Sequence, residues 1–286
     1  MNVFTKKALG CLFAALVFGC SSSAPEDAPT APEHQPANAE SVRVLQETIA
    51  PLGLEAIGEA AAQDPAKVEL GRMLFFDPIL SGSRDISCAT CHQMSQATAD
   101  EFALSSGPFF RFDEESSRAA GPQHRLTIRT SPPLFHRGHR EFTAMFWDSR
   151  LEKLADGRIV IHERSYPKLP GHYYRIMPEE LDSLLAAQAT LPVHSRDEMR
   201  GVAGTTDIHG EFNEVAPVAG HHLEGTWRRL MSRLLANDEY RQLFAAAYPD
   251  HDLDRLQFAH AANAIAAFQI EHFSPHNSRT ALHGSF

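Results

Sequence analysis

Cysteine is scarce in this chain, and the positions of its four cysteines limit their roles. Cys11 and Cys20 lie in the N-terminal leader region, whereas Cys88 and Cys91 are separated by two residues. A structural zinc site normally uses four side-chain ligands, often with a second cysteine pair, so a zinc site here is disfavoured. A thioredoxin-like redox pair would need a βαβ setting, which the flanking sequence does not suggest.

Long hydrophobic runs and an excess of positive charge are also lacking. The apolar run from Ala8 to Phe18 is too short to span a bilayer. The formal net charge is -10, and it becomes -12 if a leader containing Lys6 and Lys7 is removed. This acidic balance argues against nucleic acid as a partner and favours a cationic protein.

Cys88 and Cys91 belong to the run Cys88–His92, which reads Cys-Ala-Thr-Cys-His. Two thiols one helical turn apart can each add to a vinyl group of haem, and the adjacent histidine is then held under the iron. The pattern is specific in a chain with so few cysteines. It predicts one covalent haem c, anchored by Cys88 and Cys91, with His92 as the proximal iron ligand.

The N-terminus has the features of a bacterial export signal. Lys6 and Lys7 precede the apolar run, as in a secretory signal peptide. Residues 17–20 are similar to a lipobox, in which Cys20 becomes acylated after cleavage. The alternative is ordinary secretory cleavage nearby, with Cys20 lost or left free. We predict a signal peptide over residues 1–19, and no disulfide, because Cys11 leaves with it and every other cysteine has another role.

Residues 20–40 are small, polar and rich in proline, with almost nothing to bury. We therefore expect a lipidated cysteine and a disordered tether over 20–40, and a folded body over 41–286. The expected location is the periplasm, with the protein anchored in the membrane as a lipoprotein.

The body has mainly helical signals. Asp64 and Pro65 predict the start of a helix that ends before Asp77-Pro78. Apolar spacing predicts further helices capped by Thr226 and Asp238, and a last helix over 256–273. The Asp-Gly pair at 156–157 predicts one hairpin between 151 and 162.

Three motifs, taken in order, resemble the bacterial dihaem cytochrome c peroxidases and the related enzymes that mature methylamine dehydrogenase. They are Leu70–Pro78, Ser87–His92 and Phe146–Arg150. The resemblance runs from about residue 64 to about residue 273, which corresponds to the N-terminal haem half. It implies a mainly α fold, with a cytochrome c-like haem domain, additional helices and a small hairpin insertion over 151–180. It also implies reduction of hydrogen peroxide to water.

The resemblance assigns three catalytic residues. Glu198 would be the acid-base group for peroxide, Gln188 its neighbour, and Trp147 a conduit for electrons. The residues alone allow simpler interpretations: Glu198 as a loop carboxylate paired with Arg196 or Arg200, Gln188 as a polar helix position, and Trp147 as a core aromatic.

Other positions differ from the family pattern or match it loosely. Thr130 stands where the family has an asparagine that helps to bind calcium, so a calcium site is doubtful. His124 matches the histidine that caps the peroxide site only loosely, and a solvent-exposed histidine is the preferred interpretation. Met94 or Met145 as sixth haem ligand is a further alternative.

The family has a second Cys-x-x-Cys-His in a C-terminal domain, and this sequence contains none. We expect that second haem domain to be missing from the chain. The implied partners are hydrogen peroxide, a small electron donor such as cytochrome c or a cupredoxin, and a second copy in a homodimer. A monohaem electron-transfer cytochrome and a maturation-type oxidase acting on a protein remain alternatives.

Overall fold

The computed structural model describes residues 39–53, 60–100, 102–108, 110–112, 118–120, 126–162, 174–220 and 222–274. Two compact units are present, over 1–56 and 57–286. The first contains the helix α1 (Ala39–Ile49), which starts inside the segment expected to be a tether, and the turn η1 (Ala50–Leu52). None of the helices in these ranges is long and apolar enough to cross a bilayer.

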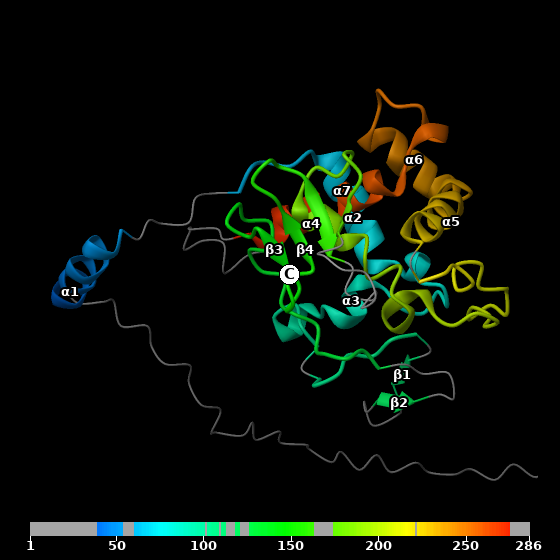
Figure 1. Cartoon of the computed structure of the whole chain (residues 1–286), viewed down its shortest axis with the longest axis horizontal. Helices are drawn as coiled ribbons and strands as arrows, with labels where there is room; N and C mark the ends of the chain where they lie inside the picture. Colours follow the sequence, from blue (N-terminus) through cyan, green and yellow to red (C-terminus); the bar gives the residue numbers. More distant parts are fainter. Residues whose placement is uncertain are drawn as a thin grey trace, which may run out of the picture. The chain divides into compact units, whose positions relative to one another are not determined.

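The second unit is built around two crossing helices, α2 (Pro65–Phe76) and α7 (Phe258–Phe273) (Figure 1). Both were expected from the sequence, and Asp64 caps α2 by accepting hydrogen bonds from backbone N–H groups of its first turn. The helices meet at Gly71, where any side chain would collide with the carbonyl of Ala264. Glycine is therefore required at this crossing, because two helix backbones approach directly.

Three further helices flank this pair: α4 (Leu184–Ala189) packs on α7, while α5 (Leu223–Leu235) and α6 (Asp238–Ala247) pack on each other. The capping predictions for the last two were wrong. Helix α5 begins before Thr226, whose buried hydroxyl bonds to a histidine and does not cap a helix end. The α6 cap is Asn237, which accepts from the N–H groups of the first turn.

A small antiparallel sheet has the strand order β3-β4-β5-β6. The predicted hairpin is its centre, with Leu151 opposite Ile161 and Gly157 turning the chain at a φ of 90°. The sheet is larger than expected, because two outer strands flank the hairpin. Two more strands form a separate antiparallel pair. The strands are β1 (Phe110–Phe112), β2 (Arg118–Ala120), β3 (Ala144–Met145), β4 (Leu151–Lys153), β5 (Ile159–His162) and β6 (Tyr174–Ile176).

Short helical turns connect these elements and carry much of the site. They are η2 (Pro78–Leu80), α3 (Cys88–Cys91), η3 (Met94–Gln96), the π-helical turn η4 (Arg196–Arg200) and η5 (Leu253–Arg255). The fold is therefore mainly helical with one small sheet, which confirms the fold class expected from the sequence.

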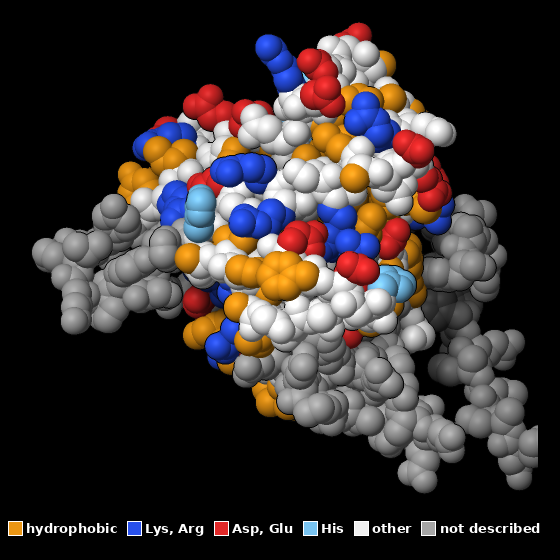
Figure 2. All heavy atoms as spheres, turned by 90° about the vertical axis from the view of Figure 1, so that its right-hand side faces the viewer, with side chains coloured by type: hydrophobic (Ala, Val, Ile, Leu, Met, Phe, Trp, Pro, Cys, Tyr) orange, Lys and Arg blue, Asp and Glu red, His pale blue; other side chains and the backbone are white. Residues whose placement is uncertain are grey.

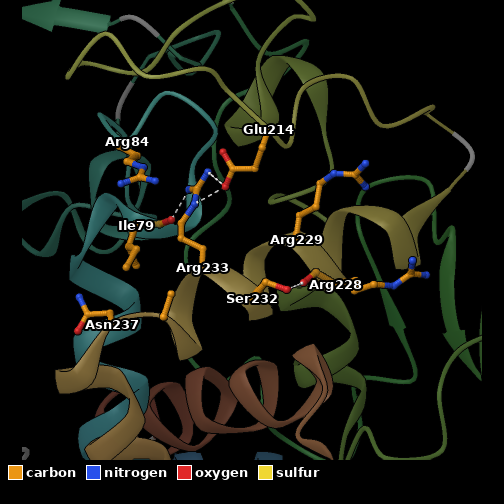
Figure 3. A pocket seen from close by; sticks show the side chains of 9 residues that line it. Ile79, Arg84, Glu214, Arg228, Arg229, Ser232, Arg233 and Asn237 are labelled. Atoms are coloured by element: carbon orange, nitrogen blue, oxygen red, sulfur yellow. Dashed lines mark hydrogen bonds and ion pairs between the residues drawn. The ribbon is translucent and has the colours of Figure 1, made fainter. Parts of the chain in front are cut away.

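One buried arginine of α5 fixes the chain between α2 and α3. Arg233 Nη1 donates to the Ile79 carbonyl at 2.6 Å, and its Nε donates to Glu214 at 2.8 Å (Figure 3). Nη1 also donates to the Ser81 carbonyl at 2.7 Å. Charge-assisted bonds of this kind hold a turn firmly. The surrounding hollow, with Arg84 and Arg229 on its walls, is thus part of the scaffold that leads into the Cys88–His92 run.

Candidate haem site

Helix α3 places the two thiols on one side of a single turn. Ser87 begins this turn, and its backbone N–H donates to Thr90 Oγ1 at 3.0 Å. Cys88 and Cys91 are both half-buried, and the Cys91 thiol donates to the Ser106 carbonyl at 3.3 Å. Burial raises the pKa of the Cys88 thiol to about 12. Both sulfur atoms are positioned for thioether bonds to one ligand.

The loop after α3 orients His92. Its Nδ1 lies 2.9 Å from the backbone carbonyl oxygen of Thr98, in a loop where Ala97 and Thr98 both have positive φ. Burial lowers the pKa of His92, which favours the neutral ring. With Nδ1–H donating to this carbonyl, Nε2 would carry the lone pair that binds a metal. This is the arrangement that a proximal haem ligand requires.

The thiols and His92 open into one cavity with an empty volume of about 1310 Å³, part of it continuous with solvent. Its walls are mainly apolar, and two arginines, Arg129 and Arg150, also line it. An apolar macrocycle with two carboxylates needs walls and cations of this kind. The residues present therefore fit a covalent haem.

Gln188 and Glu198 line the same cavity as His92. Gln188 lies near the end of α4, and Glu198 lies in η4. Ten positions separate them in the sequence, yet the fold places both side chains at one space. The structure thus brings together both polar residues that the resemblance singled out.

Within the part of the chain that the structure describes, Glu198 makes no ion pair with either flanking arginine. Arg196 pairs with Asp197 at 2.8 Å, and Arg200 is buried with its guanidinium on the Val218 carbonyl. Burial raises the pKa of Glu198, opposed by the charge of Arg150 and a hydrogen bond from Ser195. The interpretation of Glu198 as a loop carboxylate paired with Arg196 or Arg200 is therefore wrong.

Helix α5 fixes the segment between Gln188 and Glu198 at two points. The indole N–H of Trp227 donates to the Thr190 carbonyl at 3.0 Å, and both partners are buried. His194 lies with Nδ1 2.7 Å from Thr226 Oγ1. Buried polar contacts of this kind specify one conformation, so the two cavity residues are held in a defined relation.

The Phe146–Arg150 motif forms part of the cavity rim. Trp147 is 60% exposed, so it is not a core residue, and the Arg129 guanidinium lies 4.1 Å from the centre of its ring. Arg150 stacks on the Phe146 ring at 3.7 Å and bonds to Asp148 at 3.1 Å. Both arginines are thus held at the cavity by aromatic rings.

The other candidates have varied positions. Thr130 Oγ1 donates to the buried Asp100 carboxylate at 3.2 Å. The expectation that this position does not support a calcium site stays a prediction. Met94 and Met145 are absent from the described cavity lining. His124 and residues 163–173 of the insertion lie outside the described residues.

Two cavity residues were missed by sequence reasoning. Met199 follows Glu198 and is buried at the cavity wall. Gln269 of α7 also lines the cavity, although it is a polar residue on the buried face of a helix. A signal was available, because Gln269 lies four residues after Ile265, where the helical period calls for an apolar side chain.

Comparison with known proteins agrees with this geometry. A family model described as di-haem cytochrome c peroxidase matches residues 65–281. The cytochrome-c peroxidase IdrP2 of Pseudomonas sp. (strain SCT) is 30% identical over 165 residues, covering 56% of this chain and 39% of that protein. The methylamine utilization protein MauG of Methylorubrum extorquens is 37% identical over 98 residues, covering 34% of this chain and 23% of that protein. The chain thus spans less than half the length of these relatives.

Among solved structures, a MauG-like protein associated with microbial copper homeostasis covers 80% of this chain and 48% of that chain, at 20% identity and a TM-score of 0.40. The diheme peroxidase BthA from Burkholderia thailandensis covers 77% and 41%, at 18% identity and a TM-score of 0.38. The family model matches most of the chain, over a range that spans the Cys88–His92 run, Gln188 and Glu198. The chain therefore belongs to the di-haem cytochrome c peroxidase family.

Proposed function

We propose that this chain reduces hydrogen peroxide to water at a single covalent haem c, with electrons from a small redox protein. The observation that carries the proposal is one cavity lined by the haem-binding residues and by Gln188 and Glu198. A cavity built only to hold haem does not need a carboxylate of raised pKa in its wall.

The bound haem would supply the redox chemistry that cleaves the O–O bond. Glu198 would take a proton from one peroxide oxygen and return it to the other, which leaves as water. Its raised pKa suits both steps, because a group that must both accept and donate a proton works better when its pKa moves from the usual glutamate range toward the working pH. One peroxide, two electrons and two protons give two waters, with Gln188 as a hydrogen-bonding neighbour.

A monohaem electron-transfer cytochrome is the second candidate, and one observation favours it. Met199 lines the cavity, and methionine together with histidine is a common ligand pair of the haem iron in cytochromes c. In that case His92 and Met199 would both hold the iron, and peroxide would not react. An oxidase that acts on a protein substrate, as in the maturation enzymes, would still react with peroxide.

The test is to mix the haem-loaded full chain with hydrogen peroxide and to record absorbance spectra over time. We expect a spectral change whose rate rises in proportion to peroxide concentration. A spectrum that stays unchanged in the oxidised and reduced protein would overturn the peroxidase proposal and favour the electron carrier. Acid-acetone extraction checks the cofactor, because covalent haem stays with the protein, and replacing Cys88 and Cys91 by alanine should abolish it.

We further propose that the protein faces the periplasm as a membrane-anchored lipoprotein. The support is the lipobox-like sequence ending at Cys20. Cys20→Ser should leave the chain without acyl chains, either released from the membrane or uncleaved, as detected by fractionation and mass spectrometry. A variant that is still acylated and membrane-bound would show that Cys20 is not the anchor.

A further inference from the structure

A buried histidine lies just before the turn that carries Glu198. His194 is 7% exposed, and both ring nitrogens contact α5 or the chain that leads into it. Nδ1 lies 2.7 Å from Thr226 Oγ1, and Nε2 lies 2.9 Å from the Gly220 carbonyl oxygen. A carbonyl oxygen can only accept, so Nε2 carries the proton. In the neutral ring, Nδ1 then accepts from the Thr226 hydroxyl, and both nitrogens are satisfied.

The surroundings of this ring disfavour a second proton. Arg200 of η4 and Arg175 of β6 act on it with positive charge, which Glu224 of α5 partly offsets. Burial and these two cations lower the pKa of His194, so the ring is neutral at neutral pH. A second proton on Nδ1 would reverse the bond with the fully buried Thr226 hydroxyl and leave a charge inside the fold. In acid, the charged ring is therefore expected to leave its site.

His194 is connected to Glu198 through a single residue. Ser195 follows His194 and begins η4, where its carbonyl accepts from the backbone N–H groups of Met199 and Arg200 at 3.1 and 2.9 Å. The Ser195 hydroxyl donates to the Glu198 carboxylate. A displacement of His194 therefore moves the start of the turn and the hydrogen bond to Glu198 together.

We propose that His194 is an acid-sensitive positioning residue: its neutral ring holds Glu198 at the haem cavity, and protonation of the ring releases the η4 turn. The inference rests on the proposed function, because it assigns a regulation to the same site. Acid then acts on the site twice, since it protonates Glu198 and also removes the support of the turn.

The test uses three variants of the haem-loaded full chain. His194→Gln stays neutral in acid, and its amide offers an acceptor and a donor in place of Nδ1 and Nε2–H. His194→Leu removes both hydrogen bonds. His222→Leu changes an exposed histidine at the start of α5 and is the matched control.

Hydrogen exchange of peptides that cover residues 191–200, measured by mass spectrometry, reports the turn without any reaction. After correction for the intrinsic effect of pH, we expect exchange to quicken in wild type and His222→Leu as pH falls below the ordinary histidine pKa. Exchange should stay slow in His194→Gln and be fast at every pH in His194→Leu. If the leucine variant does not fold, the glutamine variant decides, and exchange that quickens in acid as in wild type would overturn the inference.

Stopped-flow mixing with peroxide tests whether His194 acts through Glu198. We expect His194→Leu to slow the reaction about tenfold or more at neutral pH, because a small misplacement of a reacting group is costly. The same substitution should have little effect in the Glu198→Gln background. Equal slowing in both backgrounds would show a general support of the haem site and overturn the inference. The expected hydrogen exchange in a protein inert to peroxide would leave the acid release of the turn standing and overturn the peroxidase proposal.

Discussion

At the scale of single residues, the cavity contains polar groups whose burial lowers the stability of the folded protein. Glu198 shows this, because burial is the main cause of its raised pKa. A carboxyl whose pKa is higher in the folded than in the unfolded state stabilises the protein below the unfolded pKa. That stability is lost as pH rises through the folded pKa. The ionised form needed for a base is thus the form that weakens the fold.

We therefore expect Glu198→Gln to raise the thermal midpoint at neutral pH, because glutamine is never charged. The gain should shrink at acid pH, where the wild-type carboxyl is protonated as well. Thermal unfolding of haem-loaded protein across the pH range measures both effects. Asp197→Asn, which removes a carboxylate paired with Arg196 in the same turn, is the matched control and should not gain stability. A glutamine variant less stable than wild type at neutral pH would contradict the account.

At the scale of elements, the α2–α7 crossing is the most constrained contact. A side chain at Gly71 would meet the carbonyl of Ala264, which belongs to helix backbone and cannot move away easily. We expect Gly71→Ala to destabilise the protein by about 3 kcal/mol or more, since overpacking against backbone is severe. Gly220→Ala is the control, because nothing lies within 4 Å of an added Cβ there and its φ is not positive.

Differential scanning calorimetry of the two alanine variants measures the effect. For a chain of this size, the Gly71 variant should melt about 6 °C or more below wild type. The Gly220 variant should stay within about 2 °C of wild type, as ordinary surface changes do. Equal losses in the two variants would show that the helix crossing is not a special contact.

The elements also show what the sequence could and could not predict. Helix α2 was predictable, because Asp64, Pro65 and the Asp77-Pro78 stop are local signals that act within one turn. The start of α5 was not predictable, because the side chain at its cap position, His222, makes no capping hydrogen bond and the hydroxyl of Thr226 is used by His194. The outer strands β3 and β6 are only two and three residues long, too short to show alternation.

The site was partly predictable for a similar reason. The Cys88–His92 run is contiguous, so its chemistry can be read directly. Gln188 and Glu198 could be predicted only from the family resemblance. They line the same cavity because α5 holds the intervening segment at Thr190 and His194. No local pattern encodes such a long-range contact.

At the scale of the whole molecule, net charge bears on the electron donor. The chain carries a formal charge of -10, although acidic and basic side chains are interspersed on the face that carries α5 and α6 (Figure 2). Overall charge steers partners at long range and is screened by salt. We expect the peroxide-dependent oxidation of a basic cytochrome c to slow as ionic strength rises, and that of an acidic cupredoxin to quicken. Steady-state rates over a range of salt concentrations test this, and rates independent of salt for both donors would contradict it.

The central claim is that Glu198 moves the proton that allows peroxide to be cleaved in the cavity of His92. The most direct test is stopped-flow absorbance of haem-loaded wild type and Glu198→Gln, mixed with hydrogen peroxide at several pH values. We predict that the variant reacts about 100-fold more slowly or worse. We also predict that the wild-type rate falls as pH drops through a pKa above the usual glutamate range, while the variant shows no such fall. Equal rates with the same pH dependence in both proteins would contradict the account.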